Sequence, residues 1–201
     1  MKLYEIIFSP VGGTKKAADI VTERLGPDST LIDLTNRSLD FTSFSFEEED
    51  VCVAAVPSYG GRIPQIAGER LGQMKGNQAR AIPVTVYGNR AYDDTMLELN
   101  DVLSEAGFRP VAAIAAVAEH SIMHQFAAGR PDEEDRRELV DFTDKIKRGI
   151  QNGSLRDTPA VPGNRPYRSF SGVPMKPRSG KSCTKCGVCA EVCPMGAIPT
   201  D

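Results

Sequence analysis

The chain has 201 residues, 40% of them hydrophobic, and a formal net charge of −3 at pH 7. This length allows one medium domain plus an appendage, and the near-neutral charge argues against a nucleic-acid-binding protein. No stretch approaches the length of a transmembrane helix, and the start of the chain lacks a signal-peptide pattern. Because the cysteines cluster in one motif, we expect a reducing, cytoplasmic compartment rather than a disulfide framework.

Strand and helix signals alternate along residues 1–151. Apolar strands are expected at 3–8, 30–34, 51–56, 81–86 and 110–118, and helices at 14–25, 64–74, 93–106 and 131–150. Strands that alternate with helices predict a parallel sheet covered by helices on both faces. Five such strands fit the doubly wound α/β order 2-1-3-4-5.

Residues 152–181 differ in composition from the rest of the chain. Prolines are interleaved there with glycine, serine and basic residues, which predicts a partly extended linker. Its basic side chains could pack against an acidic surface or a phosphate, or could simply remain solvated. We therefore expect 1–151 and 182–201 to be separate units joined by this linker.

The most specific motif is a run of four cysteines near the end of the chain. Cys183, Cys186, Cys189 and Cys193, followed by Pro194, have the C-x2-C-x2-C-x3-C-P spacing that ligates iron–sulfur clusters in bacterial ferredoxins. Zinc is the alternative metal, but zinc sites usually divide their ligands into two separated pairs. We therefore predict that these four thiols bind an iron–sulfur cluster.

The fourth cysteine of this motif raises a question of completeness. In two-cluster ferredoxins it ligates the other cluster, which needs three further cysteines. The remaining cysteine, Cys52, lies in an apolar run and is expected to be a small core residue. Either the sequence is a truncated form of a longer protein, or a partner or a non-protein ligand completes the site. We favour truncation.

Three loops are expected to share one edge of the sheet. In an open α/β sheet, ligands bind at the carboxyl ends of the strands, where the strand order reverses. The loop after the first strand combines hydroxyls and glycines at a helix N-terminus, an arrangement that favours an anion such as phosphate. A plain helix cap is equally compatible. The residues of this loop are Ser9, Pro10, Val11, Gly12, Gly13 and Thr14.

The loops after the third and fourth strands each join an aromatic residue to glycine. A flat ring could stack on the tyrosines while the glycine backbone approaches its edge, although two polar turns with incidental tyrosines are the alternative. Because all three loops share one edge, we predict a planar, phosphorylated ligand. The candidate residues here are Pro57, Ser58, Tyr59, Gly60, Gly61, Tyr87, Gly88, Asn89 and Tyr92.

These loops, the stretch 162–167 and the cysteine run together resemble bacterial flavodoxin–ferredoxin fusion proteins, the EFR-type ferredoxins. The resemblance covers nearly the whole chain. It implies a flavodoxin-like FMN-binding domain at 1–151 and, at 182–201, the first half of a ferredoxin-type domain that carries two [4Fe–4S] clusters in full-length form. It also implies low-potential electron transfer in anaerobes. By position, Ser9 and Gly12–Thr14 would hold the FMN phosphate, and Tyr59–Gly61 with Gly88, Asn89 and Tyr92 would contact the isoalloxazine.

We therefore expect an electron-transfer flavoprotein that passes electrons between an iron–sulfur cluster and FMN. Its partners would be redox proteins or a small-molecule acceptor. The alternative is a flavin-dependent oxidoreductase that reduces a quinone, with His120 or His124 as proton donors, although no carboxylate is evident as their partner. A third possibility is a flavin-free scaffold or redox sensor. The sequence does not decide between carrier and enzyme, and it gives no oligomeric state.

Overall fold

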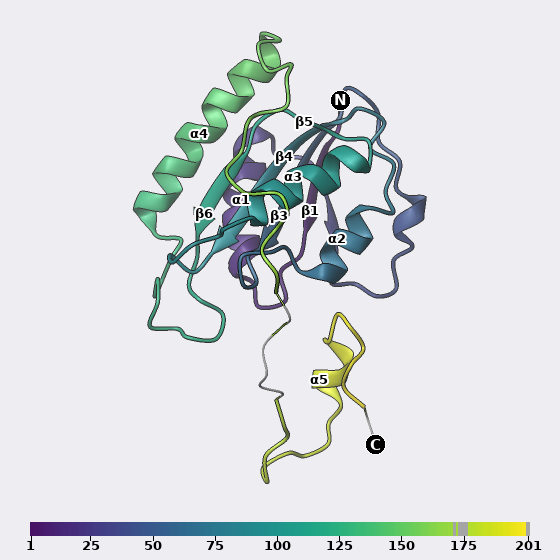
Figure 1. The fold of residues 1–201 in the computed structure, drawn as a ribbon, viewed down its shortest axis with the longest axis vertical. Helices are drawn as coiled ribbons and strands as arrows, with labels where there is room; N and C mark the ends of the chain where they lie inside the picture. Colours follow the sequence, from purple (N-terminus) through teal and green to yellow (C-terminus); the bar gives the residue numbers. More distant parts are fainter. Residues whose placement is uncertain (171, 173–176, 200–201) are drawn as a thin grey trace.

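The computed structural model describes residues 1–170, 172 and 177–199. Its centre is a parallel sheet in the order β2-β1-β3-β4-β5, and β6 also pairs with β4 (Figure 1). The predicted α/β class and strand order are therefore confirmed. The strands are β1 (Leu3–Ile7), β2 (Ser29–Asp33), β3 (Val51–Pro57), β4 (Arg80–Tyr87), β5 (Arg109–Pro110) and β6 (Ile114–Val117).

Four helices cover the sheet. They are α1 (Gly13–Leu25), α2 (Gln65–Leu71), α3 (Thr95–Glu105) and α4 (Glu133–Gln151), and a short α5 (Val188–Glu191) and a 3-10 turn, η1 (Phe41–Ser43), lie outside the layers. In Figure 1, α1 and α4 lie on one face of the sheet, and α2 and α3 on the other. The fold thus has the three-layer form expected of a doubly wound sheet.

The alternation of strand side chains builds two cores. Ile6, Cys52 and Ala54 face the core beneath α2 and α3, whereas the neighbouring residues Ile7 and Val53 face the core beneath α1 and α4. Side chains of a strand alternate between faces, so a central strand is apolar on both. Cys52 is fully buried, as expected for a small core residue.

The predicted strand at 110–118 is divided into β5 and β6. Ala81 pairs with Pro110 and Val84 with Ile114, so this edge strand holds one residue more than β4 over the same stretch. Ala79 and Ala81 accept hydrogen bonds from Arg109 and Val111, and by alternation Pro83 faces the same strand. Because proline has no N–H to donate, the ladder is interrupted there and the extra residue is accommodated.

The cysteine segment lies beside α2 at the carboxyl edge of the sheet (Figure 1). Arg70 of α2 donates from Nη2 to the carbonyl oxygen of Pro194 at 3.0 Å, and Arg37 donates to that of Ala190 at 3.5 Å. These contacts bring the segment that carries the thiols to the sheet edge where the three loops lie. Across the described part of the chain, no helix is both long and apolar enough to cross a membrane.

Candidate functional site

The three predicted loops meet at one edge of the sheet. They follow β1, β3 and β4, which are adjacent and parallel, so their carboxyl ends point the same way. The Asp94 N–H donates to the carbonyl oxygen of Gly61 at 3.1 Å and joins the loop after β4 to the loop after β3. This edge is the switch point where ligands bind in open α/β sheets.

The loop after β1 presents an open helix N-terminus. Ser9 Oγ accepts the N–H of Lys15 at 2.9 Å, and the Gly12 carbonyl accepts the N–H of Lys16 at 3.0 Å. The N–H groups of Gly13 and Thr14 have no acceptor among the described residues. Gly12 has φ +86°, and a Cβ there would meet nothing within 4 Å. Unpaired amides at a helix N-terminus suit an anion.

Two other residues of this loop are exposed to solvent. Pro10 is exposed, and the Val11 side chain is 68% exposed. The Ser9 hydroxyl oxygen accepts the Lys15 N–H, and its proton stays available to a phosphate oxygen.

The loop after β3 is a tight turn closed by two hydrogen bonds between Tyr59 and Arg62, at 2.9 and 3.3 Å. Gly60 and Gly61 have φ +61° and +83°, the left-handed pair that a type I′ turn requires and that glycine adopts without strain. The Tyr59 side chain remains 37% exposed, and partial burial raises its pKa. The turn thus presents a partly exposed aromatic ring beside two glycines.

Ser58 contacts the start of α3. Its hydroxyl lies 2.7 Å from Thr95 Oγ1 and fastens the end of β3 to the first residue of α3. Pro57, the last residue of β3, pairs with Val86 in the sheet. Both residues therefore have structural contacts of their own, and their expected role as ligand contacts stays a prediction.

The loop after β4 places Tyr87 and Tyr92 edge to face, with ring centroids 5.1 Å apart. Asn89 adopts φ +59° in the turn between them. A Cβ on Gly88 would lie 2.8 Å from Cδ2 of His120, so the loop after β6 approaches closely here. Glycine at position 88 is therefore what admits the imidazole to this edge.

Two histidines follow β6. His120 Nδ1 accepts the N–H groups of Ile122 and Met123 at 3.2 and 3.1 Å, so the proton of the neutral ring is on Nε2. His124 Nδ1 lies 2.7 Å from Glu119 Oε1. The expectation that neither histidine has a carboxylate partner is therefore wrong for His124. Hydrogen bonds from the Gly129 N–H and from His124 lower the pKa of Glu119.

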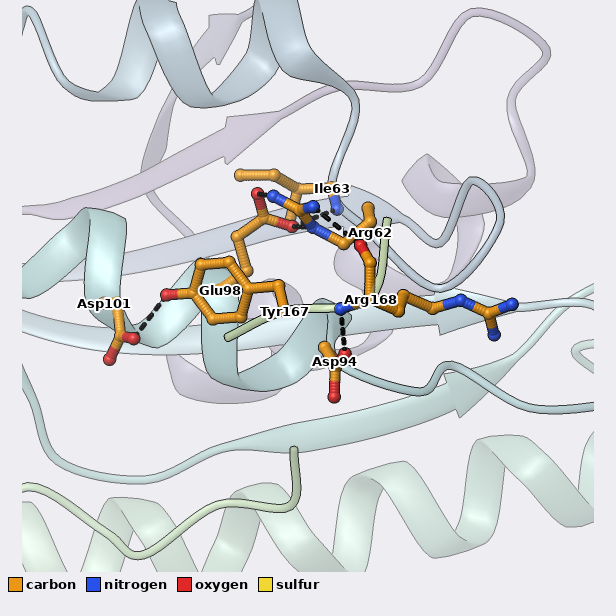
Figure 2. Close-up of polar contacts among 7 residues, drawn as sticks. All are labelled: Arg62, Ile63, Asp94, Glu98, Asp101, Tyr167 and Arg168. Atoms are coloured by element: carbon orange, nitrogen blue, oxygen red, sulfur yellow. Dashed lines mark hydrogen bonds and ion pairs between the residues drawn. The ribbon is translucent and has the colours of Figure 1, made fainter. Parts of the chain in front are cut away.

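Arg62 is held in an ion pair and is not a solvated loop charge. Its Nε and Nη2 donate to Glu98 at 2.7 and 2.6 Å, and Glu98 Oε2 also accepts the Ile63 N–H at 2.9 Å (Figure 2). The guanidinium carbon lies 4.8 Å from the centroid of the Tyr167 ring. The Glu98 hydrogen bond raises the pKa of Arg62. One carboxylate thus ties the double-glycine turn to α3.

Part of the predicted linker is docked on α3. Figure 2 shows Tyr167 and Arg168 lying across α3 beside Asp94, Glu98 and Asp101. The sequence analysis left open whether the basic side chains of the linker pack on an acidic surface, and it did not identify that surface. The spacing of the three acidic residues, which places them on one face of a helix, could have identified it.

The thiols of the cysteine run are reduced, with Cys183, Cys186 and Cys189 exposed and Cys193 half-buried. Hydrogen bonds from the backbone N–H of Val188 and of Ala197 lower the pKa of Cys186 and Cys193, respectively. In the described residues, three or more ligating side chains do not gather at metal-binding distance. The donor set, four accessible thiols with thiolate-stabilising amides, suits an iron–sulfur cluster, and the loop would have to close around it.

A groove of about 950 Å³ joins the two regions. Its lining includes Phe8, Pro10 and Tyr59 from the sheet edge, Phe170 from the docked linker, and Pro194 and Met195 from the cysteine segment. Tyr59 and the cysteine segment therefore border the same space.

Comparisons with known proteins match these two regions separately. Residues 181–198 match the 4Fe-4S binding domain family. Over 73% of the chain, the fold resembles a flavodoxin of Streptococcus pneumoniae TIGR4, at 23% identity and a TM-score of 0.53, covering 98% of that chain. Oxidised flavodoxin 1 from Bacillus cereus has 15% identity and a TM-score of 0.52, covering 74% of this chain and 98% of that one.

A third similar structure is the Flv1 flavodiiron core from Synechocystis sp. PCC6803, at 14% identity and a TM-score of 0.53. That match covers 76% of this chain and 36% of the other. No curated protein matches the chain. At these identities the structural likeness establishes the flavodoxin-like fold, and the 4Fe-4S match establishes a ferredoxin-type segment after it.

Proposed function

We propose that this chain is an electron-transfer protein that passes electrons between FMN at the carboxyl edge of the sheet and a [4Fe–4S] cluster at the cysteine run. The observation that carries the proposal is the presence of both sites in one chain. A flavodoxin-like sheet has an open helix N-terminus and a double-glycine turn at its switch point, and residues 181–198 match the 4Fe-4S binding domain family. We assign 1–151 to FMN, 152–181 to the linker and 182–201 to the cluster segment.

The chain's own groups suit the three parts of FMN. The free N–H groups of Gly13 and Thr14, with the α1 dipole, would bind the phosphate. Tyr59 and Tyr92 would contact the isoalloxazine ring, and the backbone of Gly60 and Gly61 would lie at its edge. Bound FMN would supply the ability to take up two electrons and release them singly, while the protein positions it.

Cys183, Cys186, Cys189 and Cys193 would hold the cluster, which exchanges one electron at a time. The N–H groups that lower the pKa of Cys186 and Cys193 favour the thiolate form that binds iron. Hydrogen bonds of this kind are also among the factors that set a cluster's potential. The resemblance to flavodoxin–ferredoxin fusion proteins, rather than these contacts, leads us to propose a low-potential carrier in the reducing cytoplasm of an anaerobe, with redox proteins as its partners.

The histidines support a second candidate function. The neutral ring of His120 keeps its proton on Nε2 beside Gly88, and His124 is paired with Glu119. A flavin-dependent oxidoreductase that reduces a quinone-like acceptor would use such a proton donor at this edge. Anaerobic steady-state assays with quinones and with ferredoxins would separate the two functions, because a carrier reduces proteins and an oxidoreductase turns over the quinone.

The proposal is tested by purifying the protein without oxygen and measuring its iron, its flavin and its absorption spectrum. We expect FMN and iron–sulfur absorption together. Protein that contains neither, and that takes up neither after anaerobic reconstitution, would refute the proposed function.

The assignment of the ring contacts has its own test. Tyr59→Ala should weaken FMN binding about tenfold and more than Tyr92→Ala, because base–aromatic stacking contributes roughly 1–3 kcal/mol and Tyr92 is partly engaged with Tyr87. A fluorescence titration with FMN measures both. Equal and negligible effects would contradict stacking on Tyr59.

A further inference from the structure

The docked part of the linker makes unusually close contact with α3 and with the double-glycine turn. We call residues 163–170 the strap. At its start, Gly163 has φ +143°, and a Cβ there would lie 2.5 Å from Cβ of Leu97 on α3. No side chain fits between the strap and the helix at this point, so the strap backbone rests directly on α3.

A buried carboxylate anchors the strap. Asp94 is 3% exposed, and its Oδ1 accepts the Asn164 N–H at 2.8 Å, while its Oδ2 accepts the Arg168 N–H at 2.7 Å. Asn164 Nδ2 adds a third contact to Oδ1 at 3.3 Å. The hydrogen bond from Arg168 is the main cause that lowers the pKa of Asp94. A buried charge is costly without such partners, so strap docking stabilises Asp94 where it lies.

Further contacts fix the middle of the strap. Asp101 accepts Arg165 Nε at 2.9 Å and Tyr167 Oη at 2.5 Å. Arg62 Nη1 donates to the Arg168 carbonyl at 2.9 Å and lies over the Tyr167 ring (Figure 2). Because Arg62 directly follows Gly61, this contact connects the strap to the turn itself.

The end of the strap packs on the two glycines. A Cβ on Gly60 would lie 2.3 Å from the Phe170 ring, and a Cβ on Gly61 would lie 2.6 Å from Cδ of Arg168. Arg168 Nη1 also pairs with Asp93 Oδ2 at 2.5 Å. The strap therefore presses against the backbone of the turn that carries Tyr59.

We propose that the strap is a structural part of the FMN site, so that strap docking and FMN binding stabilise each other. The inference rests on the proposed function. A turn of two glycines is conformationally free on its own, and ordering it for a ligand costs entropy. A strap that already holds the turn removes that cost, and linkage requires that bound FMN stabilise the docked strap by the same factor. Phe170 and Asp94 are positioning residues in this scheme.

The test compares two strap variants with one matched control in an FMN titration. Asp94→Asn removes the anchoring charge, and Phe170→Ala removes the ring at Gly60. Phe142→Ala is the control. Phe142 on α4 is 44% exposed and Phe170 is 42% exposed, so each of these two variants loses an aromatic ring of similar exposure. We expect a dissociation constant about tenfold higher for each strap variant, within the range of site–site coupling, and no change for the control.

The double variant, Asp94→Asn with Phe170→Ala, should also have a dissociation constant for FMN about tenfold above that of the wild type. The two effects should not add, because both changes undock the same strap. Phe170 is half exposed, so its removal does not threaten folding. If wild-type protein binds FMN and the strap variants bind it equally well, the coupling is wrong and the proposed function stands. If wild-type protein binds no FMN, the proposed function fails and the coupling falls with it.

The reciprocal effect gives a measurement on the strap itself. Trypsin cleaves after Arg168 within the strap and after Arg156, which is exposed before it. Saturating FMN should slow cleavage after Arg168 about tenfold and leave cleavage after Arg156 unchanged, because proteolysis follows the population of the open strap. Asp94→Asn should speed cleavage after Arg168 even without FMN. FMN-independent cleavage at Arg168 in wild-type protein that binds FMN would overturn the proposal.

Discussion

Two bidentate arginine–carboxylate pairs in this protein have nearly the same geometry and different surroundings. Arg62 donates to Glu98 at 2.7 and 2.6 Å, and Arg24 donates to Asp144 at 2.7 and 2.8 Å. The Glu98 side chain is 12% exposed and that of Asp144 is 26% exposed, while Arg62 is 27% and Arg24 is 49% exposed. Comparing Glu98→Ala with Asp144→Ala therefore shows how burial changes the stability that an ion pair contributes when the donor–acceptor distances are nearly the same.

The expected magnitudes differ several-fold. Glu98→Ala removes three hydrogen bonds, including one from the Ile63 N–H, and leaves the partly buried Arg62 guanidinium without its carboxylate, although the Arg168 carbonyl still accepts from it. Losing such partners should destabilise the protein by about 2–4 kcal/mol. Asp144→Ala breaks a pair that solvent screens and should cost clearly less than Glu98→Ala. Both residues lie in helices, so alanine changes helix propensity similarly in the two variants.

Urea denaturation of the ligand-free protein at low and at high salt measures both changes. With a urea dependence of about 2 kcal/mol per molar, Glu98→Ala should lower the unfolding midpoint by roughly 1–2 M. High salt should remove the smaller effect of Asp144→Ala and leave most of the larger one. Equal losses below about 1 kcal/mol would show that Arg62 relaxes into solvent and that the buried pair does not stabilise the turn.

Three further predictions concern other parts of the chain. Burial raises the pKa of Glu5 to about 7 from its ordinary 4.5. Between these two pH values the native state holds a proton that the unfolded chain has lost, so the protein loses stability as the pH rises from 4.5 to about 7. Glu5→Gln should flatten this decline in a series of urea midpoints and be the more stable protein at pH 8; an unchanged slope would contradict the assignment. Cys186→Ser should lower iron content after anaerobic reconstitution, whereas Cys52→Ala, at a fully buried position, should retain it; equal iron loss in both would refute the ligand set. Gly12→Ala should cost about 1 kcal/mol from its positive φ alone, and Gly60→Ala should cost more because its Cβ meets an aromatic ring; equal melting temperatures would argue against that contact.

The sheet was predictable because its signals are local. The apolar runs of β3 and β4 are long enough to identify buried strands, and glycine-rich turns follow them in sequence. The division of the edge strand was not foreseen, because it depends on Pro83 facing that strand across the sheet. A missing donor on a neighbouring strand leaves no mark in the edge strand's own sequence.

The loops of the candidate site could be predicted from the sequence, but the side chains that hold these loops in place could not. Glycines and tyrosines that follow strands indicate a ligand edge directly. The partners of Arg62 and Arg168 could not be assigned from the sequence, because each arginine could pair with several acidic residues, depending on how the chain folds. Only the structure shows that Glu98 and Asp94 are the acids they meet. Likewise, the hydrogen bond from the Lys15 N–H to the Ser9 hydroxyl oxygen could not be assigned from the sequence.

Anchoring the strap also limits how far the thiols can travel. Thirteen residues lead from Phe170 to Cys183, which at full extension reach about 45 Å. A tether of that length keeps its two ends at an effective concentration of the order of millimolar, however dilute the protein is. Exchange between the two redox centres would then be a first-order event within one molecule, with a rate that does not change when the sample is diluted.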